Sequence, residues 1–370
     1  MTHSAEWYTV QNMEDIDTPA LLVYPARVHD NIRQMIRIVG DLEKLRPHVK
    51  TYKMAEIVKM QMNEGIHKFK CATIAEAEML ALVGVTDTLL AYQPVGPKIQ
   101  RLLKLVQHYP KIKFSTLVDN EDTARSISQV FQAEGKVLHI YIDLDIGNNR
   151  TGIPPENALQ LYKLSQTLGG IKVAGLHAYD GHIRESDLSV RKKICDVCFE
   201  GVKQLQKNIL VLDGQHLEII AGGSPTFPIH AQRQNVVCSP GTCLLWDWGI
   251  GQRFQDMNFS WAALVATRII SLVGNDKICL DLGHKAIASE NPFPRALFLN
   301  LPEAEQIFHS EEHLVLKVPD NKCYKVGDLF YGVPFHICPT CALYQEAQIV
   351  EEGQITKTWK VVSRDRSITI

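Results

Sequence analysis

The sequence predicts an α/β fold, in which a (β/α)8 (TIM) barrel over residues 21–250 precedes a mostly antiparallel β domain over residues 251–370. Two observations lead to this prediction. Short apolar runs alternate with helix-period segments through the first part of the chain, as expected of repeated βα units. After about Gly251 the apolar runs follow one another without long helices between them. An open doubly wound sheet remains the alternative to a closed barrel.

The expected barrel strands are apolar throughout rather than alternating, which is typical of parallel strands that are covered on both faces. The strands are expected at Ala20–Tyr24, His48–Tyr52, Phe69–Ala72, Thr88–Tyr92, Lys113–Val118, Leu138–Asp143, Lys172–Leu176 and Leu217–Ala221. The intervening helices are expected at Ala26–Val39, Ile74–Val83, Ile99–Gln107, Glu121–Glu134 and Glu156–Leu168.

The second domain is expected to be a β structure that ends in a hairpin. Its strands are expected at Trp261–Val273, Lys277–Leu282, Asp328–Val333 and Ala347–Val350. The hairpin is expected to span Gln348–Val362 and to turn around Glu351-Glu352-Gly353, because a glycine next to polar residues favours a tight turn.

Composition narrows the class of protein. A chain of 370 residues suits a barrel with a companion domain, and 45% hydrophobic residues can fill a sizeable core. The formal net charge of −2 gives no case for a nucleic-acid or membrane partner. The sequence has no apolar run of membrane-spanning length, and its N-terminus lacks a signal pattern. Nine cysteines, an odd number over a long chain, favour reduced thiols and a cytoplasmic location.

Lys53 follows an expected strand and precedes an expected helix that begins near Ala55. It ends the run Arg46-Pro47-His48-Val49-Lys50-Thr51-Tyr52-Lys53. A lysine at the carboxyl end of a strand can be partly desolvated, and its amine is then suited to Schiff-base chemistry. A solvated lysine in a βα loop is the alternative interpretation.

Two loops rich in small residues are candidates for binding phosphate. Gly222-Gly223-Ser224-Pro225-Thr226 follows one apolar strand, and Ser239-Pro240-Gly241-Thr242 follows the run Val236–Cys238. Such loops leave backbone N–H groups free to surround a phosphate, and late barrel loops often do so. Ordinary Gly/Pro turns are the alternative.

Polar side chains also follow two earlier strands. Arg150 lies in the loop after Leu138–Asp143 and could bind a ligand's ring nitrogen or carboxylate, or pair with Asp143 or Asp145 as a structural bridge. The strand at Lys172–Leu176 leads into His177-Ala178-Tyr179-Asp180-Gly181-His182, at a position where barrel enzymes place catalytic groups.

His336 and Cys338 are candidate metal ligands. In a strand their side chains would face the same way, and a nitrogen with a soft sulfur favours zinc. A buried structural pair is the alternative. Cys195 and Cys198 also have metal-type spacing, but their segment is helical in pattern, which favours an ordinary helix face.

This ordered set of motifs resembles the fold-type III, pyridoxal-phosphate-dependent D-threonine aldolase and D-serine dehydratase family, which is related to alanine racemase. The matching segments are Asp17–Ala20, Arg46–Lys53, Gly222–Thr226, Pro240–Thr242 and His336–Thr340, so the resemblance covers almost the whole chain. It implies a barrel that holds the cofactor and a β domain with which residues 1–20 pack. It also implies a homodimer.

The resemblance gives roles to individual residues. It implies that Lys53 carries the Schiff base, and that Gly222, Gly223, Ser224, Thr226, Gly241 and Thr242 hold the phosphate. Arg150 and Tyr179 would contact the cofactor ring. His336 and Cys338 would bind a divalent metal, zinc first, with manganese or magnesium as alternatives. The chain departs from the family at Tyr52, where histidine is usual, and at Cys341.

The implied activity is a D-threonine aldolase-like lyase, which cleaves β-hydroxy D-amino acids to glycine and an aldehyde, with Lys53 as a catalytic residue. His182 is the candidate catalytic base because it lies at a strand mouth, and a structural histidine with satisfied hydrogen bonds is the alternative. A D-serine dehydratase, which gives pyruvate and ammonia, is the alternative. An amino-acid racemase and a non-catalytic pyridoxal-phosphate carrier are further options.

Overall fold

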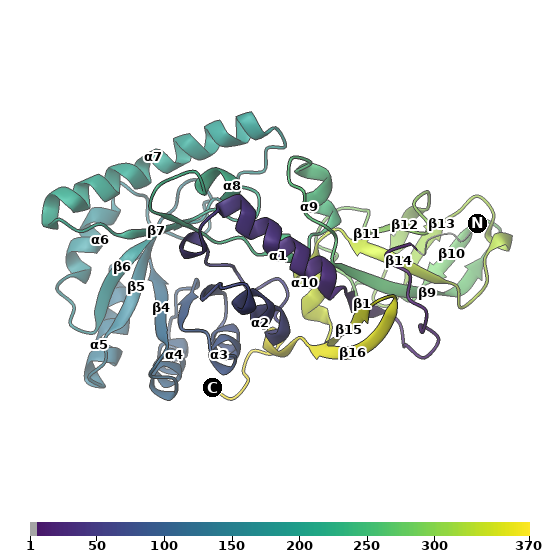
Figure 1. The fold of residues 1–370 in the computed structure, drawn as a ribbon, viewed down its shortest axis with the longest axis horizontal. Coiled ribbons are helices and arrows are strands. Elements are labelled where there is room, and N and C mark those ends of the chain that lie inside the picture. Colours follow the sequence, from purple (N-terminus) through teal and green to yellow (C-terminus); the bar gives the residue numbers. More distant parts are fainter. Residues whose placement is uncertain (1–5) are drawn as a thin grey trace. The chain divides into compact units, whose positions relative to one another are not determined.

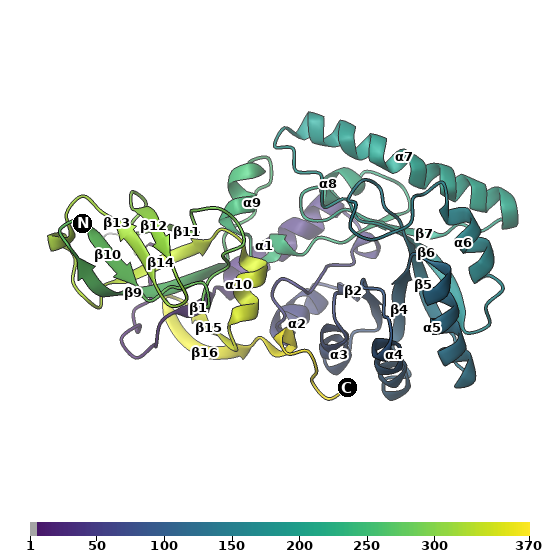
Figure 2. The same ribbon diagram turned by 180° about the vertical axis from the view of Figure 1, so that it is seen from behind.

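The computed structural model describes residues 6–370, which form two compact units. The first unit comprises the chain up to Arg33, the segment Thr51–Ile57 and the stretch Thr242–Arg364. The second comprises Gln34–Lys50, Val58–Gly241 and Asp365–Ile370. Neither unit is therefore one contiguous segment of the sequence (Figures 1 and 2).

A parallel sheet of seven strands forms the second unit, and its strands follow one another in sequence order. Helices separate successive strands and lie along the outer face of the sheet (Figure 1). The strands are β2 (Lys68–Cys71), β3 (Asp87–Leu90), β4 (Lys113–Val118), β5 (Leu138–Asp143), β6 (Ile171–Ala178), β7 (Glu218–Ala221) and β8 (Val236–Cys238). The helices are α3 (Ile74–Leu82), α4 (Pro97–His108), α5 (Glu121–Ala133), α6 (Ala158–Ser165), α7 (Leu188–Asp213), α8 (Phe227–His230) and the 3-10 turn η1 (Leu42–Lys44).

The segment Leu45–Val49 closes this sheet into a ring. The N–H of Arg46 donates to the carbonyl of Cys238 after β8 (2.9 Å), and the N–H of Lys70 in β2 donates to the carbonyl of Pro47 (2.9 Å). Leu45 and His48 form parallel bridges to the same two strands. The predicted barrel is therefore confirmed, with an irregular segment in its eighth position.

The strand predicted at His48–Tyr52 is wrong. His48 forms a single bridge, and residues 49–52 are turns. Pro47 has no N–H to contribute to a ladder. Lys53, with φ of 55°, follows these turns instead of ending a strand.

Side chains from strands that are not neighbours meet inside the ring. Arg46 is fully buried and pairs with Asp87 of β3 (2.5 Å) and with Glu218 of β7 (3.4 Å). Tyr141 of β5 donates its hydroxyl to Glu218 (2.7 Å). Burial alone would raise the pKa of Asp87, but the contacts with Arg46 outweigh it and hold that pKa below its usual value. In this network the buried guanidinium of Arg46 is therefore neutralised by the carboxylates of Asp87 and Glu218.

A mostly antiparallel sheet of nine strands forms the first unit. Its main order is β12-β13-β10-β9-β1-β15-β16, and β14 pairs with β9 and β11. The strands are β1 (Ala20–Val23), β9 (Ala263–Val273), β10 (Lys277–Leu280), β11 (Ala296–Phe298), β12 (Glu305–His309), β13 (Leu314–Lys317), β14 (Leu329–Pro334), β15 (Glu346–Glu351) and β16 (Gln354–Lys360). The expected β domain is therefore present, and β11, β12 and β13 are strands that the sequence analysis did not predict.

The strand predicted at Ala20–Tyr24 exists as β1 but does not belong to the barrel. Leu22 lies opposite Leu264 in the antiparallel pairing with β9 and opposite Gln348 in the parallel pairing with β15. All four residues of β1 are buried. A strand buried on both faces has the same apolar composition in either sheet, so the pattern could not assign it.

The predicted hairpin is confirmed by the antiparallel pairing of β15 with β16. Glu352 and Gly353 have φ of 51° and 76°, as the tight turn requires. Residues before β1 pack in the same unit, since Tyr8, Val10 and Met13 share a core with β1, β9 and β14. Residues 1–5, which the resemblance also assigns to this domain, lie outside the described residues.

The remaining helices are short, or a boundary between the two units falls within their residues. α1 (Pro25–Val39) and α2 (Ala55–Asn63) each contain such a boundary. The first unit also contains α9 (Trp248–Arg253), α10 (Ile337–Leu343) and the 3-10 turns η2 (Thr242–Leu244), η3 (Asn321–Cys323) and η4 (Val362–Arg364). Among residues 6–370, the helices are all too short or too polar to cross a membrane.

Candidate functional site

The two predicted phosphate loops lie side by side at the carboxyl ends of β7 and β8. The Ser224 hydroxyl accepts the N–H of Gly241 (3.2 Å) and ties one loop to the other. Both loops require glycine, because a Cβ on Gly222 would lie 2.9 Å from the Cα of Phe227, and a Cβ on Gly241 would lie 2.6 Å from the carbonyl of His48. Glycine at both positions therefore allows the loops to pack closely against Phe227 and His48.

Asp180 holds the first loop through hydrogen bonds to Gly223 and Thr226. One carboxylate oxygen accepts the Thr226 hydroxyl (2.8 Å) and the N–H of Gly223 (3.4 Å), and the other accepts the Nε2–H of His230 (2.9 Å). Asp180 is buried, and although burial raises its pKa, these hydrogen bonds outweigh burial and keep that pKa low. The Thr226 hydroxyl therefore donates to Asp180 and fixes the loop in place.

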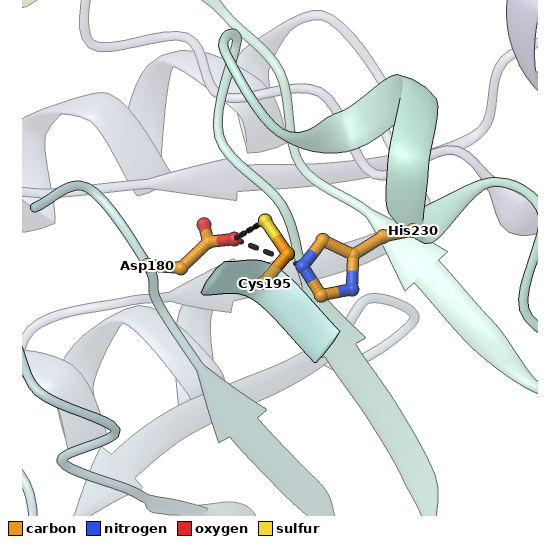
Figure 3. Close-up of side chains that lie close together, drawn as sticks. All are labelled: Asp180, Cys195 and His230. Carbon is orange, nitrogen blue, oxygen red and sulfur yellow. Dashed lines mark hydrogen bonds and ion pairs between the residues drawn. The ribbon is translucent and has the colours of Figure 1, made fainter. Parts of the chain in front are cut away.

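Asp180, Cys195 and His230 are close enough together to suggest a metal site, because their ligand atoms lie within 4.8 Å of one another. Their protons argue for a hydrogen-bonded network instead. Burial raises the pKa of Cys195, whose thiol donates to Asp180 (3.8 Å). The Nδ1 of His230 accepts the Nε–H of Arg233 (3.2 Å), so both ring nitrogens are already used. Figure 3 shows the three side chains facing one another.

Cys195 and Cys198 lie on α7, as their helical pattern indicates. The Cys195 thiol contacts Asp180 (3.8 Å), whereas the Cys198 thiol contacts the Nε2 of His182 (3.7 Å). The two thiols therefore have different partners. The Nδ1 of His182 is buried without a hydrogen-bond partner among the described residues, which leaves this atom available to accept a proton.

Tyr179 lies against the first phosphate loop. A Cβ on Gly223 would lie 3.2 Å from its ring. The guanidinium carbon of Arg150 lies 5.0 Å from the centre of the same ring. Within residues 6–370 Arg150 forms no ion pair with Asp143 or Asp145, since Asp143 bonds to His177 and Thr151, and Asp145 accepts backbone N–H groups of its own loop. The structural bridge considered for Arg150 is therefore not formed.

A buried Asp143–His177–Lys70 chain crosses the barrel interior and was missed by the sequence analysis. The Nδ1 of His177 lies 2.7 Å from Asp143, and its Nε2 lies 3.4 Å from the Nζ of Lys70. Burial, aided by Lys50, lowers the pKa of Lys70 to about 7. Lys70 lies between the apolar residues Phe69 and Cys71 in β2. Only its burial in the folded chain distinguishes it from an ordinary surface lysine.

Lys53 belongs to the first unit, together with the predicted metal ligands. Its carbonyl accepts the N–H (3.4 Å) and the hydroxyl (3.3 Å) of Ser363. The preceding Tyr52 is fully buried. A non-glycine residue in the left-handed region is uncommon and is frequently found at functional positions.

His336 and Cys338 lie at the start of α10, so the expectation that they share a strand is wrong. Their side chains nevertheless hydrogen-bond to each other, and Glu290 pairs with the Nδ1 of His336. Burial lowers the pKa of His336, but Cys338 and Glu290 outweigh burial and raise this pKa to about 9. A carboxylate on Nδ1 leaves Nε2 for a metal, which is the usual arrangement around histidine ligands. Glu290 was not predicted.

Hydroxyl and carboxylate groups position this pair. The Sγ of Cys338 contacts the hydroxyls of Thr51 (3.2 Å) and Thr242 (3.5 Å). The buried Asp247 accepts the N–H of Ile337 (3.1 Å) and so fixes the first turn of α10. Thr242, which was predicted to bind phosphate, is thereby also a neighbour of the predicted metal ligand.

Comparison with known proteins supports the fold and the family that the sequence predicts. Residues 23–243 match the family described as alanine racemase, N-terminal domain, and residues 262–350 match a serine dehydratase domain family. The chain is 26% identical to a D-threonine aldolase of an Arthrobacter species, over 94% of this chain and 93% of the relative. It is also 26% identical to a 3-hydroxy-D-aspartate aldolase of Paracoccus denitrificans, over 95% and 93%.

A solved structure has the same architecture. The crystal structure of D-threonine aldolase from Filomicrobium marinum superimposes with a TM-score of 0.85 at 25% identity, covering 95% of this chain and 96% of that one. The predicted fold class and the predicted relationship are thus confirmed. The chain belongs to the alanine racemase N-terminal domain family and is related, over nearly its whole length, to pyridoxal-phosphate-dependent D-threonine aldolases.

Proposed function

We propose that the protein is a pyridoxal-phosphate- and metal-dependent lyase that cleaves the Cα–Cβ bond of β-hydroxy D-amino acids to glycine and an aldehyde. The observation that carries this proposal is the contact between His336 and Cys338, with Glu290 on the far side of the imidazole. A nitrogen and sulfur donor pair of this kind suits a metal that grips the substrate's β-hydroxyl. The relatives with aldolase names support the same activity.

The residues present fit pyridoxal phosphate. The loop glycines Gly222, Gly223 and Gly241 leave no room for a Cβ, and Ser224 joins the two loops, which suits a backbone cradle for phosphate. The Nζ of Lys53 would hold the cofactor covalently, with Thr242 and Thr226 on the phosphate side. Arg150 and Tyr179 would face the ring. When bound, the cofactor supplies an electron sink for the bond that breaks at Cα.

His336 and Cys338 would hold the metal, and zinc matches their nitrogen and sulfur donors better than manganese or magnesium. The metal would supply Lewis acidity to the β-hydroxyl and favour its loss of a proton. We assign the role of base to His182, because its buried Nδ1 has no hydrogen-bond partner among residues 6–370 and can accept that proton. Tyr52 can donate a hydrogen bond but does not replace a histidine base.

D-serine dehydratase activity is the second candidate, and the serine dehydratase domain match over residues 262–350 favours it. In that reaction Lys53 would remove the Cα proton, and the metal would stabilise the leaving hydroxide. The test gives D-serine to the enzyme loaded with cofactor and zinc. Absence of pyruvate and ammonia supports the aldolase; their release as the main activity contradicts it. Activity that survives chelation would favour a racemase instead, and a bound chromophore without turnover would favour a non-catalytic carrier.

The physical state of the enzyme completes the proposal. We expect a homodimer in a reducing, cytoplasmic compartment, and none of the nine cysteines, all within residues 6–370, forms a disulfide, which fits such a compartment. Sedimentation analysis at micromolar concentration tests the dimer, and a monomer with full activity would contradict it.

A further inference from the structure

A cavity of about 360 Å3 lies on the helix side of the parallel sheet, among residues of β3, α3, α4 and the segment after η4. Asp87 and Leu89 of β3 face the barrel interior, where Asp87 pairs with Arg46 and Leu89 packs with residues of β4, β5, β7 and β8. Side chains alternate along a strand, so Leu90 faces the helices and this cavity. The cavity is therefore separate from the barrel interior, and its lining residues all belong to the second unit.

Three cations line this cavity: Lys98 and Arg101 of α4, and Arg366. Lys98 and Arg101 are three residues apart on a helix, so they lie on the same face of it. The lining residues include no Asp or Glu, and among residues 6–370 no side-chain carboxylate pairs with any of the three cations. The nearby carboxylate of Glu76 accepts the N–H of Ala72 instead (2.6 Å). Cations gathered without an acidic partner attract an anion.

The segment that carries Arg366 is fixed to the helices. Glu78 of α3 is fully buried, and it accepts the N–H groups of Thr369 (3.0 Å) and Ile370 (3.3 Å) and the Thr369 hydroxyl. The Nη2 of Arg101 donates to the backbone oxygens of Arg366 (2.9 Å) and Ile370 (2.5 Å). Residues 366–370 are therefore held against α3 and α4, which makes Arg366 part of the wall of the cavity.

The rest of the wall is largely apolar. Ile74, Leu90 and Pro94 are buried, and the half-exposed ring of Tyr92 lies beside them. The Nζ of Lys98 lies 4.6 Å from the centre of that ring. An aromatic ring next to cations suits a ligand with an apolar body and an anionic group. Small-molecule sites usually measure about 300–1,000 Å3, so the size of this cavity also fits a small ligand.

We propose that this cavity is a second ligand site, which binds a small organic phosphate ester. Lys98, Arg101 and Arg366 contact the phosphate, and the apolar body lies against Tyr92 and Leu90. Three cations match a phosphate dianion better than a carboxylate with its single charge. Arg101 can hold the segment 366–370 and the ligand together, because the N–H groups on its Nε and Nη1 are not used in the contacts with that segment. The site is independent of the proposed function, since it shares no residue with the cofactor loops or the predicted metal ligands.

The test is calorimetric titration of the protein with phenyl phosphate, after it has been loaded with pyridoxal phosphate and zinc so that the cofactor loops are occupied. We expect one phenyl phosphate per chain. Benzyl alcohol, which lacks the charge, inorganic phosphate, which lacks the ring, and benzoate, which has one charge, should each bind more weakly by about 10-fold or more.

Two variants test the walls of the cavity. Lys98→Met should weaken phenyl phosphate binding by about 10-fold, the usual value of a hydrogen bond to a charged group, and Tyr92→Ala by about 3- to 10-fold. Lys98 and Tyr92 are exposed, so both variants should fold, and thermal unfolding checks this. Lys104→Met is the matched control, because it removes the same charge from an exposed position of α4 outside the cavity.

Four results would overturn the proposal. Equal losses in Lys98→Met and Lys104→Met would reduce the effect to general attraction of anions. Benzyl alcohol or benzoate that binds as tightly as phenyl phosphate would contradict a phosphate site. Binding that appears only after pyridoxal phosphate is removed would place the probe in the cofactor loops. Absence of heat with the wild-type protein at millimolar phenyl phosphate would show that the cavity takes no such ligand. Because the readout is binding rather than turnover, each result stands whether or not the aldolase assignment holds.

Discussion

Lys53 is the residue on which the cofactor assignment depends, and its setting differs from the one that the sequence predicts. It follows a turn, has a left-handed backbone and is fixed through its carbonyl by Ser363. The chemistry of the lysine could be predicted from the motif around it. Its backbone could not, because Pro47 and the ring-closing contacts of residues 45–49 interrupt a run that has strand composition.

Reduction of the cofactor-loaded protein with borohydride should attach the phosphopyridoxyl group to the peptide that contains Lys53. Lys53→Ala should lose this label and lower kcat by at least about 1,000-fold, since covalent attachment and proton transfer share one amine. Peptide mass spectrometry checks the position. A label on Lys50 or Lys70 in the wild type would contradict the assignment.

Cys338→Ala should lose the bound metal, because it leaves His336 as a single protein donor at the start of α10. We expect the metal content to fall below about one tenth of the wild-type value, in line with the loss of a ligand and its oriented partner. Elemental analysis of the purified proteins measures it. Cys323→Ser is the matched control, since Cys323 is free and exposed; equal metal content in all three proteins would contradict the site.

At the scale of elements, the loop after β7 depends on a support that the sequence does not reveal. The motif Gly222–Thr226 predicts a phosphate loop, but Asp180, which holds it, is far from it in the sequence, while His230 and Arg233 follow it closely without any sign of their role. Asp180 acts as a positioning residue because it bonds to the loop directly, and His230 and Arg233 act through it, since His230 bonds to Asp180 and Arg233 to His230. The clue in the sequence was Asp180 itself, which lies within the strand-mouth run His177–His182.

Thr226→Val should loosen this loop, because valine keeps the shape of threonine but cannot donate to Asp180. We expect a loss of about 1–3 kcal/mol in the free energy of unfolding, the usual result when a buried acceptor loses its donor. Pyridoxal phosphate binding should weaken several-fold with little change in KM. Thermal unfolding and cofactor titration measure the two effects. Thr167→Val, which removes an exposed loop hydroxyl, is the control; equal effects in both variants would contradict a special role for Thr226.

Helix and strand elements were predictable where the apolar pattern was clear, as in the strands from β2 to β7 and the hairpin of β15 and β16. The segment at His336–Cys338 was not, because Asp247 and the following residues favour a helical turn that an i, i+2 argument cannot anticipate. The two ligands still meet, since neighbouring residues in a first helical turn are also close in space. The proximity of the two side chains was therefore predicted from a wrong element, and their metal-binding role stays a prediction.

At the scale of the whole molecule, the sequence predicts two consecutive domains, whereas each compact unit gathers several segments. β1 illustrates the reason. Its four apolar residues satisfy either a barrel strand or the centre of the antiparallel sheet, and only the pairing with β9 and β15 decides. The apolar composition of β1 predicts that the strand is buried, and its long-range pairing partners determine to which sheet it belongs.

Lys70 makes the stability of the apoprotein depend on pH. Burial lowers its folded pKa to about 7, below the unfolded value of about 10.4. The unfolded chain thus binds more protons between these two values, and stability rises with pH across this window. Lys70→Met removes the free-energy cost of burying this amine. The variant should therefore be more stable than wild type at pH 7 by up to a few kcal/mol. The difference should shrink toward pH 10.

Urea unfolding of both apoproteins at pH 7 and at pH 10 measures this effect. A stability difference that stays constant between the two pH values would contradict it, because a packing effect of methionine does not depend on pH.

The most direct test of the central claim is the product balance from D-threonine with the enzyme loaded with pyridoxal phosphate and zinc. The account predicts glycine and acetaldehyde in equal amounts, with activity lost on chelation and restored by zinc. Formation of 2-oxobutanoate and ammonia as the main products, or unchanged aldol cleavage after the metal is removed, would contradict it.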